Sequence, residues 1–131
     1  MRSHLALCAL LLPGFAWALP SAPAERAELF ARCAGSFAAE AEHLRLMGGD
    51  ALPQVEETER MFSLLLDATV TGEMRTGDTA IALRVARAEA RLIQRELLTA
   101  ATFAVHRTHR DPARHAAERR LSLCQKLLLG S

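Results

Sequence analysis

The sequence predicts an all-α protein that folds as an antiparallel up-down-up-down four-helix bundle, and three observations lead to this prediction. Apolar residues recur at helical spacing over nearly the whole chain. No segment shows the alternation of apolar and polar residues that is typical of a β-strand. Glycine and proline divide the chain into four helical segments with short connections, and short connections favour antiparallel neighbours.

The amino terminus has the organisation of a secretory signal peptide. Arg2 supplies a positive charge, an uncharged apolar run follows, and Ala16 and Ala18 are the small residues that a cleavage site needs. The run is shorter than the roughly 20 residues of a membrane span. We therefore expect residues 1–18 to be cleaved, leaving residues 19–131 as a single helical-bundle domain with no transmembrane segment.

Residue usage suggests the compartment. All but one of the 16 basic residues are Arg, and Ala is very frequent. Both features fit a GC-rich coding bias, which favours a bacterial source. With a signal peptide, such a protein is expected to be secreted, and its expected location is the bacterial periplasm.

Start and stop signals place the four helices. The first begins near Ser21 and ends at Met47, and the second follows Asp50 and stops near Gly72. The third, the longest, is capped by Asp78 or Thr79. The clearest start is that of the fourth helix, where Asp111 can cap and Pro112 suits the first helical position.

The inward faces follow from the helical period of 3.6 residues. The predicted core positions are Phe30, Cys33, Phe37, Ala41, Leu44 and Met47 on the first helix, Val55, Phe62, Leu65 and Thr69 on the second, Ala82, Val85, Ile93, Ala100 and Ala104 on the third, and Ala113, Ala117, Leu121, Cys124 and Leu128 on the fourth.

The mature chain would keep two cysteines, because Cys8 is removed with the signal peptide. Cys33 lies early in the first helix and Cys124 late in the fourth, on inward faces of helices that are antiparallel neighbours in the bundle. An oxidising compartment favours a bond between them. We expect a structural disulfide. Two buried free thiols are the alternative, and the absence of C-x-x-C argues against a catalytic pair.

Charge is distributed unevenly along a chain whose net charge is only +1. Residues 19–78 hold 11 acidic and five basic residues, whereas residues 79–131 hold four acidic and ten basic residues. We expect the two halves to pack together and neutralise each other. A protein that binds nucleic acid over its whole surface would be basic overall, so no nucleic-acid partner is expected.

Four arginines form a straight stripe on the outside of the third helix, at Arg84, Arg87, Arg91 and Arg95. Such a stripe is often solvated, or pairs with a neighbouring acidic helix, and the second helix offers Glu56, Glu57 and Glu59. The functional alternative is a docking surface for an anionic protein or an envelope component.

Four other charged residues project into the apolar arcs, where an unpaired charge is costly to bury. They are Glu40 on the first helix, Glu89 and Glu96 on the third, and Arg120 on the fourth. We expect a partly exposed ion-pair cluster between Arg120 and one or more of the acids. A ligand-binding groove built on the same residues is the alternative.

Candidate metal ligands are few. Glu40 and His43 have the i, i+3 spacing of carboxylate-bridged di-metal sites, but no second Glu-x-x-His motif is present. His106 and His109 are also three residues apart. A simpler role for that pair is to satisfy carbonyl groups at a helix carboxyl terminus. No cofactor is expected, and these three histidines are the candidate metal ligands.

No catalytic or nucleotide-binding motif occurs, including G-x-S-x-G, H-E-x-x-H, a Walker loop and C-x-x-C-H. The first functional hypothesis is an exported, non-enzymatic protein that works by binding. The second is a bundle that handles a metal or small ligand through its inward Glu and His residues. An enzyme is the third, and the sequence suggests no reaction for it.

Overall fold

The computed structural model describes residues 19–129, so the predicted signal peptide lies outside the described residues. This part of the chain contains four α-helices and no strand, which confirms the predicted all-α class. The helices are α1 (Pro23–Met47), α2 (Leu52–Thr69), α3 (Gly77–Phe103) and α4 (Arg107–Leu129), and the 3-10 helix η1 (Gly72–Arg75) connects α2 to α3. No helix in this range is both long and apolar enough to cross a membrane.

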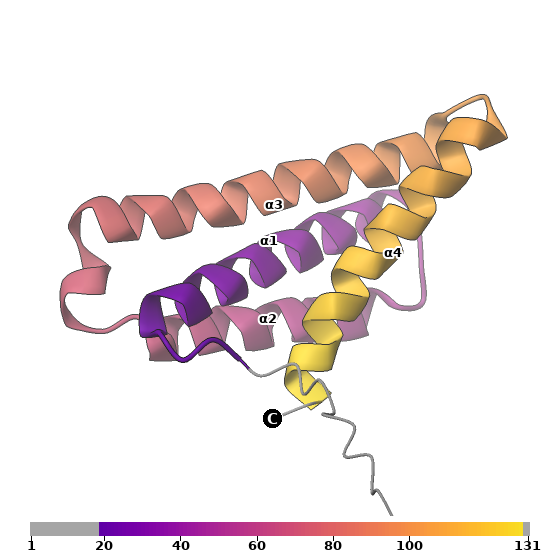
Figure 1. The fold of residues 1–131 in the computed structure, drawn as a ribbon. Helices are drawn as coiled ribbons and strands as arrows, with labels where there is room; N and C mark the ends of the chain where they lie inside the picture. Colours follow the sequence, from indigo (N-terminus) through magenta and orange to yellow (C-terminus); the bar gives the residue numbers. More distant parts are fainter. Residues whose placement is uncertain (1–18, 130–131) are drawn as a thin grey trace, which may run out of the picture.

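Successive helices alternate in direction, as the up-down-up-down prediction requires (Figure 1). Helix α1 lies in the middle and packs against α2 on one side and α3 on the other. Helix α4 starts next to the end of α3 and crosses the other helices obliquely, so that its last turns reach the aromatic core. This oblique crossing leaves α4 close to α3 but in only limited contact with α1.

The central position of α1 follows from its small residues. Ala27, Ala31 and Ala34 are fully buried, and Gly35 lies against the backbone of α3. Small side chains let two helix axes approach closely, so α1 can pack against two neighbours at once. The helix ends at Gly48, whose φ of 74° favours glycine.

Aromatic residues fill the space between α1 and α2. The ring of Phe62 lies 5.8 Å from the ring of Phe37 and 6.3 Å from that of Phe30, measured between centroids. Cys33 and Cys124 complete this cluster. Leucines from α4 pack against it, which joins the fourth helix to the core. Met47, predicted to lie in the core, is instead half exposed at the end of α1.

The buried face of α3 differs from the predicted face. The buried residues of this helix are Leu83, Ala86, Ala90, Gln94, Leu98 and Ala101. Ala82 is exposed, and Val85 and Ile93 are 48% and 41% exposed, although all three are predicted to be core residues. The prediction is wrong because α3 turns toward α1 the side that carries Ala86 and Ala90, and the two backbones approach closely at Gly35.

Helix α4 begins at Arg107 rather than at Asp111. The carbonyl oxygen of His106 accepts a hydrogen bond from the backbone N–H of His109 at 3.1 Å, which starts the helix earlier than predicted. Pro112 therefore lies inside the helix. As the sixth residue of α4, Pro112 has no N–H to donate to the carbonyl group of Thr108, so one intrahelical hydrogen bond is absent at this turn.

Candidate functional site

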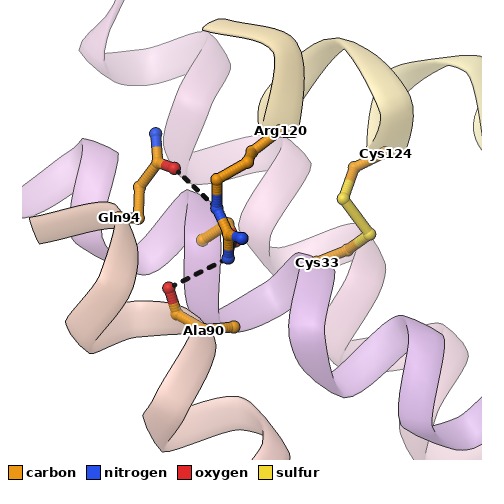
Figure 2. Close-up of a disulfide and its surroundings, with 6 residues drawn as sticks. Cys33, Ala90, Gln94, Arg120 and Cys124 are labelled. Carbon is orange, nitrogen blue, oxygen red and sulfur yellow. Dashed lines mark hydrogen bonds between the residues drawn. A yellow bond between two sulfur atoms is a disulfide. The ribbon is translucent and has the colours of Figure 1, made fainter. Parts of the chain in front are cut away.

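The predicted disulfide joins α1 to α4. The sulfur atoms of Cys33 and Cys124 are 2.02 Å apart, and the two residues are separated by 91 positions in the sequence. Figure 2 shows that the side chain of Arg120, one turn before Cys124, enters the space between α3 and α4 next to this bond. The disulfide thus fixes the helix that carries this arginine.

Arg120 lies inward, as predicted, but its partners are neutral. Its Nε donates to Oε1 of Gln94 at 3.2 Å, and its Nη2 donates to Oγ of Ser36 at 3.3 Å and to the carbonyl oxygen of Ala90 at 3.4 Å. Burial lowers the pKa of the Arg120 guanidinium, and the positive charge of Arg32 lowers it further. The positive charge of Arg120 is therefore stabilised by the dipoles of an amide, a hydroxyl and a carbonyl group, and not by a carboxylate.

Gln94 is the centre of this network and is not among the site residues predicted from the sequence. The residue is completely buried, and its Nε2 donates to the carbonyl oxygen of Ala117 at 3.3 Å and to Oε2 of Glu40 at 3.5 Å. A correct assignment of the α3 face would have found it, because Gln94 lies one turn from both Ala90 and Leu98.

The expected ion pair between Arg120 and an acid does not occur within residues 19–129. Only Glu40 of the three predicted acids reaches the network, and it does so through Gln94. Glu89 and Glu96 are exposed, because the face of α3 that carries them is directed toward solvent. The predicted ion-pair cluster with Arg120 therefore does not include these two residues.

The arginine stripe is largely paired within the molecule. Nη2 of Arg87 is 2.6 Å from Oε1 of Glu59 on α2, and Nη2 of Arg95 is 3.0 Å from Oε2 of Glu42 on α1. Arg91 also pairs with Glu42. Glu59 is one of the predicted acidic partners, whereas Glu42 was not considered. The ion pairs of the stripe therefore connect α3 to α1 and α2, and these three arginines already have partners within the molecule.

Arg84 differs from the other three stripe residues. Its Nε donates to the carbonyl oxygen of Ala80 at 3.3 Å, and within the described part of the chain it forms no ion pair. One exposed arginine is a small target for an anionic partner. A docking surface made of the whole stripe would have to compete with three internal ion pairs.

A crevice of about 460 Å³ opens where α4 crosses α1 and α3. Its apolar lining includes Leu44, Leu98 and Leu121, one from each of the three helices. Its polar lining combines basic, acidic and neutral hydrogen-bonding side chains, namely Glu40, His43, Thr102, Arg110, Arg114 and Glu118. Its volume lies within the range of small-ligand sites.

Two of the crevice residues are basic and have no acidic partner. Arg110 and Arg114, one turn apart on α4, form no ion pair among the residues that the structure describes. The Nε atom of Arg110 is buried and has no hydrogen-bond partner within residues 19–129. On the opposite wall, His43 Nε2 and Thr102 Oγ1 are 3.2 Å apart in a hydrogen bond. The crevice therefore has free donor capacity.

Neither arginine is predicted from the sequence to line a site. Because Asp111 and Pro112 predict the start of the fourth helix, Arg110 lies outside that predicted helix and is not assigned to one of its faces. The early start at Arg107 puts Arg110 and Arg114 on one face of α4, toward the crevice. Glu40 and His43, which the sequence did single out, line the same space.

The candidate metal ligands do not gather into a set. Within residues 19–129, no three His, Cys, Asp or Glu side chains lie close enough together to hold a metal ion. The rings of His106 and His109 are 6.5 Å apart and exposed. They lie at the start of α4 and not at a helix carboxyl terminus, so the expected carbonyl-satisfying role is also wrong.

Comparison with known proteins adds no relative to this description. No protein-family model, curated protein or solved structure matches the chain.

Proposed function

We propose that this chain is an exported, non-enzymatic binding protein whose site is the crevice between α1, α3 and α4. Two features support export: the signal-type amino terminus with its Ala16 and Ala18, and the Cys33–Cys124 disulfide. Disulfides persist in oxidising compartments and are rare in the bacterial cytosol, so the bond agrees with secretion to a periplasm.

The proposed ligand is an organic monoanion with an apolar body, such as a medium-chain carboxylate. The observation that carries this proposal is the buried, unpartnered Nε of Arg110. Buried donors in native proteins are nearly always satisfied, so a ligand acceptor would remove an unfavourable feature of the free protein. Arg114 lies one turn away and can add a second charge-assisted hydrogen bond.

The rest of the lining restricts the ligand further. Leu44, Leu98 and Leu121 can cover an apolar body, which supplies affinity by burial. Glu40 and Glu118 line the same crevice, so a multiply charged anion would meet repulsion. A single carboxylate with a hydrocarbon or aromatic body suits this combination better than a phosphate, a polyanion or an anionic protein.

Calorimetric titration with decanoate tests this proposal, and decylamine serves as the comparison because it has the same chain with the opposite charge. We expect decanoate to bind at one site per protein and decylamine to bind much more weakly. The Arg110→Gln and Arg114→Gln variants should each weaken decanoate binding about tenfold or more, since a charge-assisted hydrogen bond contributes about 1.5–3 kcal/mol.

Arg119→Gln is the matched control, because Arg119 is exposed on the same helix and does not line the crevice. It should leave decanoate binding unchanged. Equal binding of decanoate and decylamine, or equal losses in the Arg110 and Arg119 variants, would refute a charge-selective site in this crevice.

A further inference from the structure

Helix α3 has a second apolar face that the bundle does not use. Ile81, Val85 and Leu92 are 55%, 48% and 52% exposed, and they project opposite the buried face that contains Ala86 and Ala90. Large apolar side chains that share one exposed helix face mark an interaction surface more often than scattered ones do.

The spacing along this face is that of a coiled-coil seam. Ile81, Val85, Ala88 and Leu92 are separated by four, three and four residues, which is the alternation of d and a positions in a heptad repeat. Val85 and Leu92 occupy a positions in this register, and Ile81 and Ala88 occupy d positions. The next d position is Arg95, which is turned toward Glu42 on α1 at 3.0 Å, so the seam ends after Leu92.

The charges that flank the seam are sorted by sign. Arg84 and Arg91 occupy g positions on one side, and Glu89 and Glu96 occupy e positions on the other side. In a parallel pair of helices, a g residue faces the e residue five positions later on the partner. Arg84 would face Glu89 of a second copy and Arg91 would face its Glu96. An antiparallel pair would instead bring like charges together.

These side chains are available for such pairing. Arg84 has no ion pair within residues 19–129, and the side chain of Glu89 is 57% exposed, with Arg32 no closer than 4.0 Å. Arg91 pairs with Glu42, but its side chain is still 47% exposed and has donors for a second carboxylate. The seam also lies away from the crevice, which uses other residues of α3.

We propose that a second copy of this chain covers the exposed face of α3, in a symmetric dimer whose two α3 helices run parallel. The seam has only four apolar positions, so we expect a weak dimer that exchanges with monomer at micromolar concentrations. The flanking ion pairs then contribute much of the stability of the dimer. This proposal is independent of the ligand crevice, and either can fail without the other.

Sedimentation velocity over a concentration series tests the dimer. The wild-type protein should shift from monomer to dimer as concentration rises, and Leu92→Glu should remain monomeric at every concentration. Leu123→Glu is the matched control, because Leu123 is 46% exposed on α4 and outside the seam; it should dimerise like the wild type. A wild-type protein that stays monomeric at millimolar concentration overturns the proposal, and so does a Leu92→Glu variant that still dimerises.

A charge exchange tests the predicted partners. Arg84→Glu and Glu89→Arg each place like charges at the same contact, so each variant alone should dimerise at least about tenfold more weakly. Mixed in equal amounts, they restore an opposite-charge pair and should form a heterodimer. Failure of the mixture to recover dimerisation, with both variants folded by circular dichroism, contradicts the pairing.

Cross-linking tests the orientation. Ile81→Cys and Leu92→Cys variants, treated with a short bis-maleimide, should each cross-link to their own kind, because parallel helices place each position beside its copy. The bonded Cys33 and Cys124 have no thiol and do not react. Cross-links that form only between the two different variants would indicate antiparallel helices and overturn the proposal.

Discussion

A Cβ atom added to Gly35 would lie 2.1 Å from the carbonyl oxygen of Arg87, so the backbones of α1 and α3 touch where they cross. Helix propensity alone predicts that Gly35→Ala stabilises the protein by about 1 kcal/mol. The close contact predicts the opposite sign, a loss of about 1–3 kcal/mol, because the helices must separate. Urea unfolding measures the free energy, and a more stable Gly35→Ala variant would show that the crossing is not so close.

The disulfide closes a loop of about 90 residues in the unfolded chain. In the chain-entropy model, this restriction stabilises the folded state by about 4–5 kcal/mol. A Cys33→Ala/Cys124→Ala variant should therefore lose a large part of its unfolding free energy and melt at a much lower temperature. Calorimetry of the variant beside the reduced and oxidised wild type provides the measurement. Equal melting temperatures in all three would contradict a stabilising disulfide.

Arg120 and Gln94 stabilise each other as partners in one network. Arg120→Met removes a partly buried charge but leaves Oε1 of Gln94 without its 3.2 Å donor, so we expect a loss of about 1–3 kcal/mol. Gln94→Met should cost at least as much, because it leaves the partly buried charge of Arg120 with fewer partners. The double variant should cost clearly less than the sum. Strictly additive losses would mean that the two side chains are independent.

Glu42 gives the stability a measurable pH dependence. Burial raises the pKa of this carboxyl group, but the hydrogen bonds and charges of Arg91 and Arg95 outweigh burial and hold its pKa below its ordinary value. A folded-state pKa below the unfolded one contributes stability at neutral pH, and that contribution disappears as the pH falls through the folded-state pKa.

Glu42→Gln should therefore lower the unfolding free energy at pH 7, by under about 1 kcal/mol because the arginine side chains are largely exposed. Its deficit relative to the wild type should shrink to nothing in strong acid. Glu73→Gln is the control, because Glu73 is exposed in η1 and forms no ion pair within the described range. A deficit that is constant with pH would rule out the ion pair as its cause.

The sequence was sufficient for the features that depend on local pattern. Helical periodicity and the Gly48 stop signal placed α1, and opposite directions of the first and fourth helices brought Cys33 near Cys124. The inward position of Arg120 also followed from its register with Cys124. These features need only the period of a helix and the order of the elements.

The buried face of α3 could not be predicted from the same information, because that helix has two apolar faces. The side of Val85 and Ile93 carries large apolar residues, and so does the buried side, with Leu83 and Leu98. Which face of α3 is buried depends on its contact with α1, where the backbone of α3 lies against Gly35. That contact is a property of the two helices together and not of the α3 sequence alone. Glu89 and Glu96 are predicted to lie inward for the same reason, since they are close to Val85 and Ile93 on the helix surface.

The candidate site was predicted only in part. Glu40 and His43 were selected by their spacing and do line the crevice. Arg110 is not predicted because Pro112 indicates a helix start after it. Glu42 is not predicted because the expected partners of the α3 arginines are the acidic residues of α2. Both errors concern which elements meet, which depends on the oblique course of α4 and the central position of α1.

Export together with oxidation of Cys33 and Cys124 is tested most directly by the intact mass of the protein made from its full sequence in a bacterial host. We expect a chain that begins at Leu19, with the mass of residues 19–131 less the two hydrogen atoms lost in one disulfide. It should be recovered by osmotic shock and should not react with a maleimide. A chain that still begins at Met1, or a mature chain whose two cysteines are free, would contradict the link between the exported compartment and this fold.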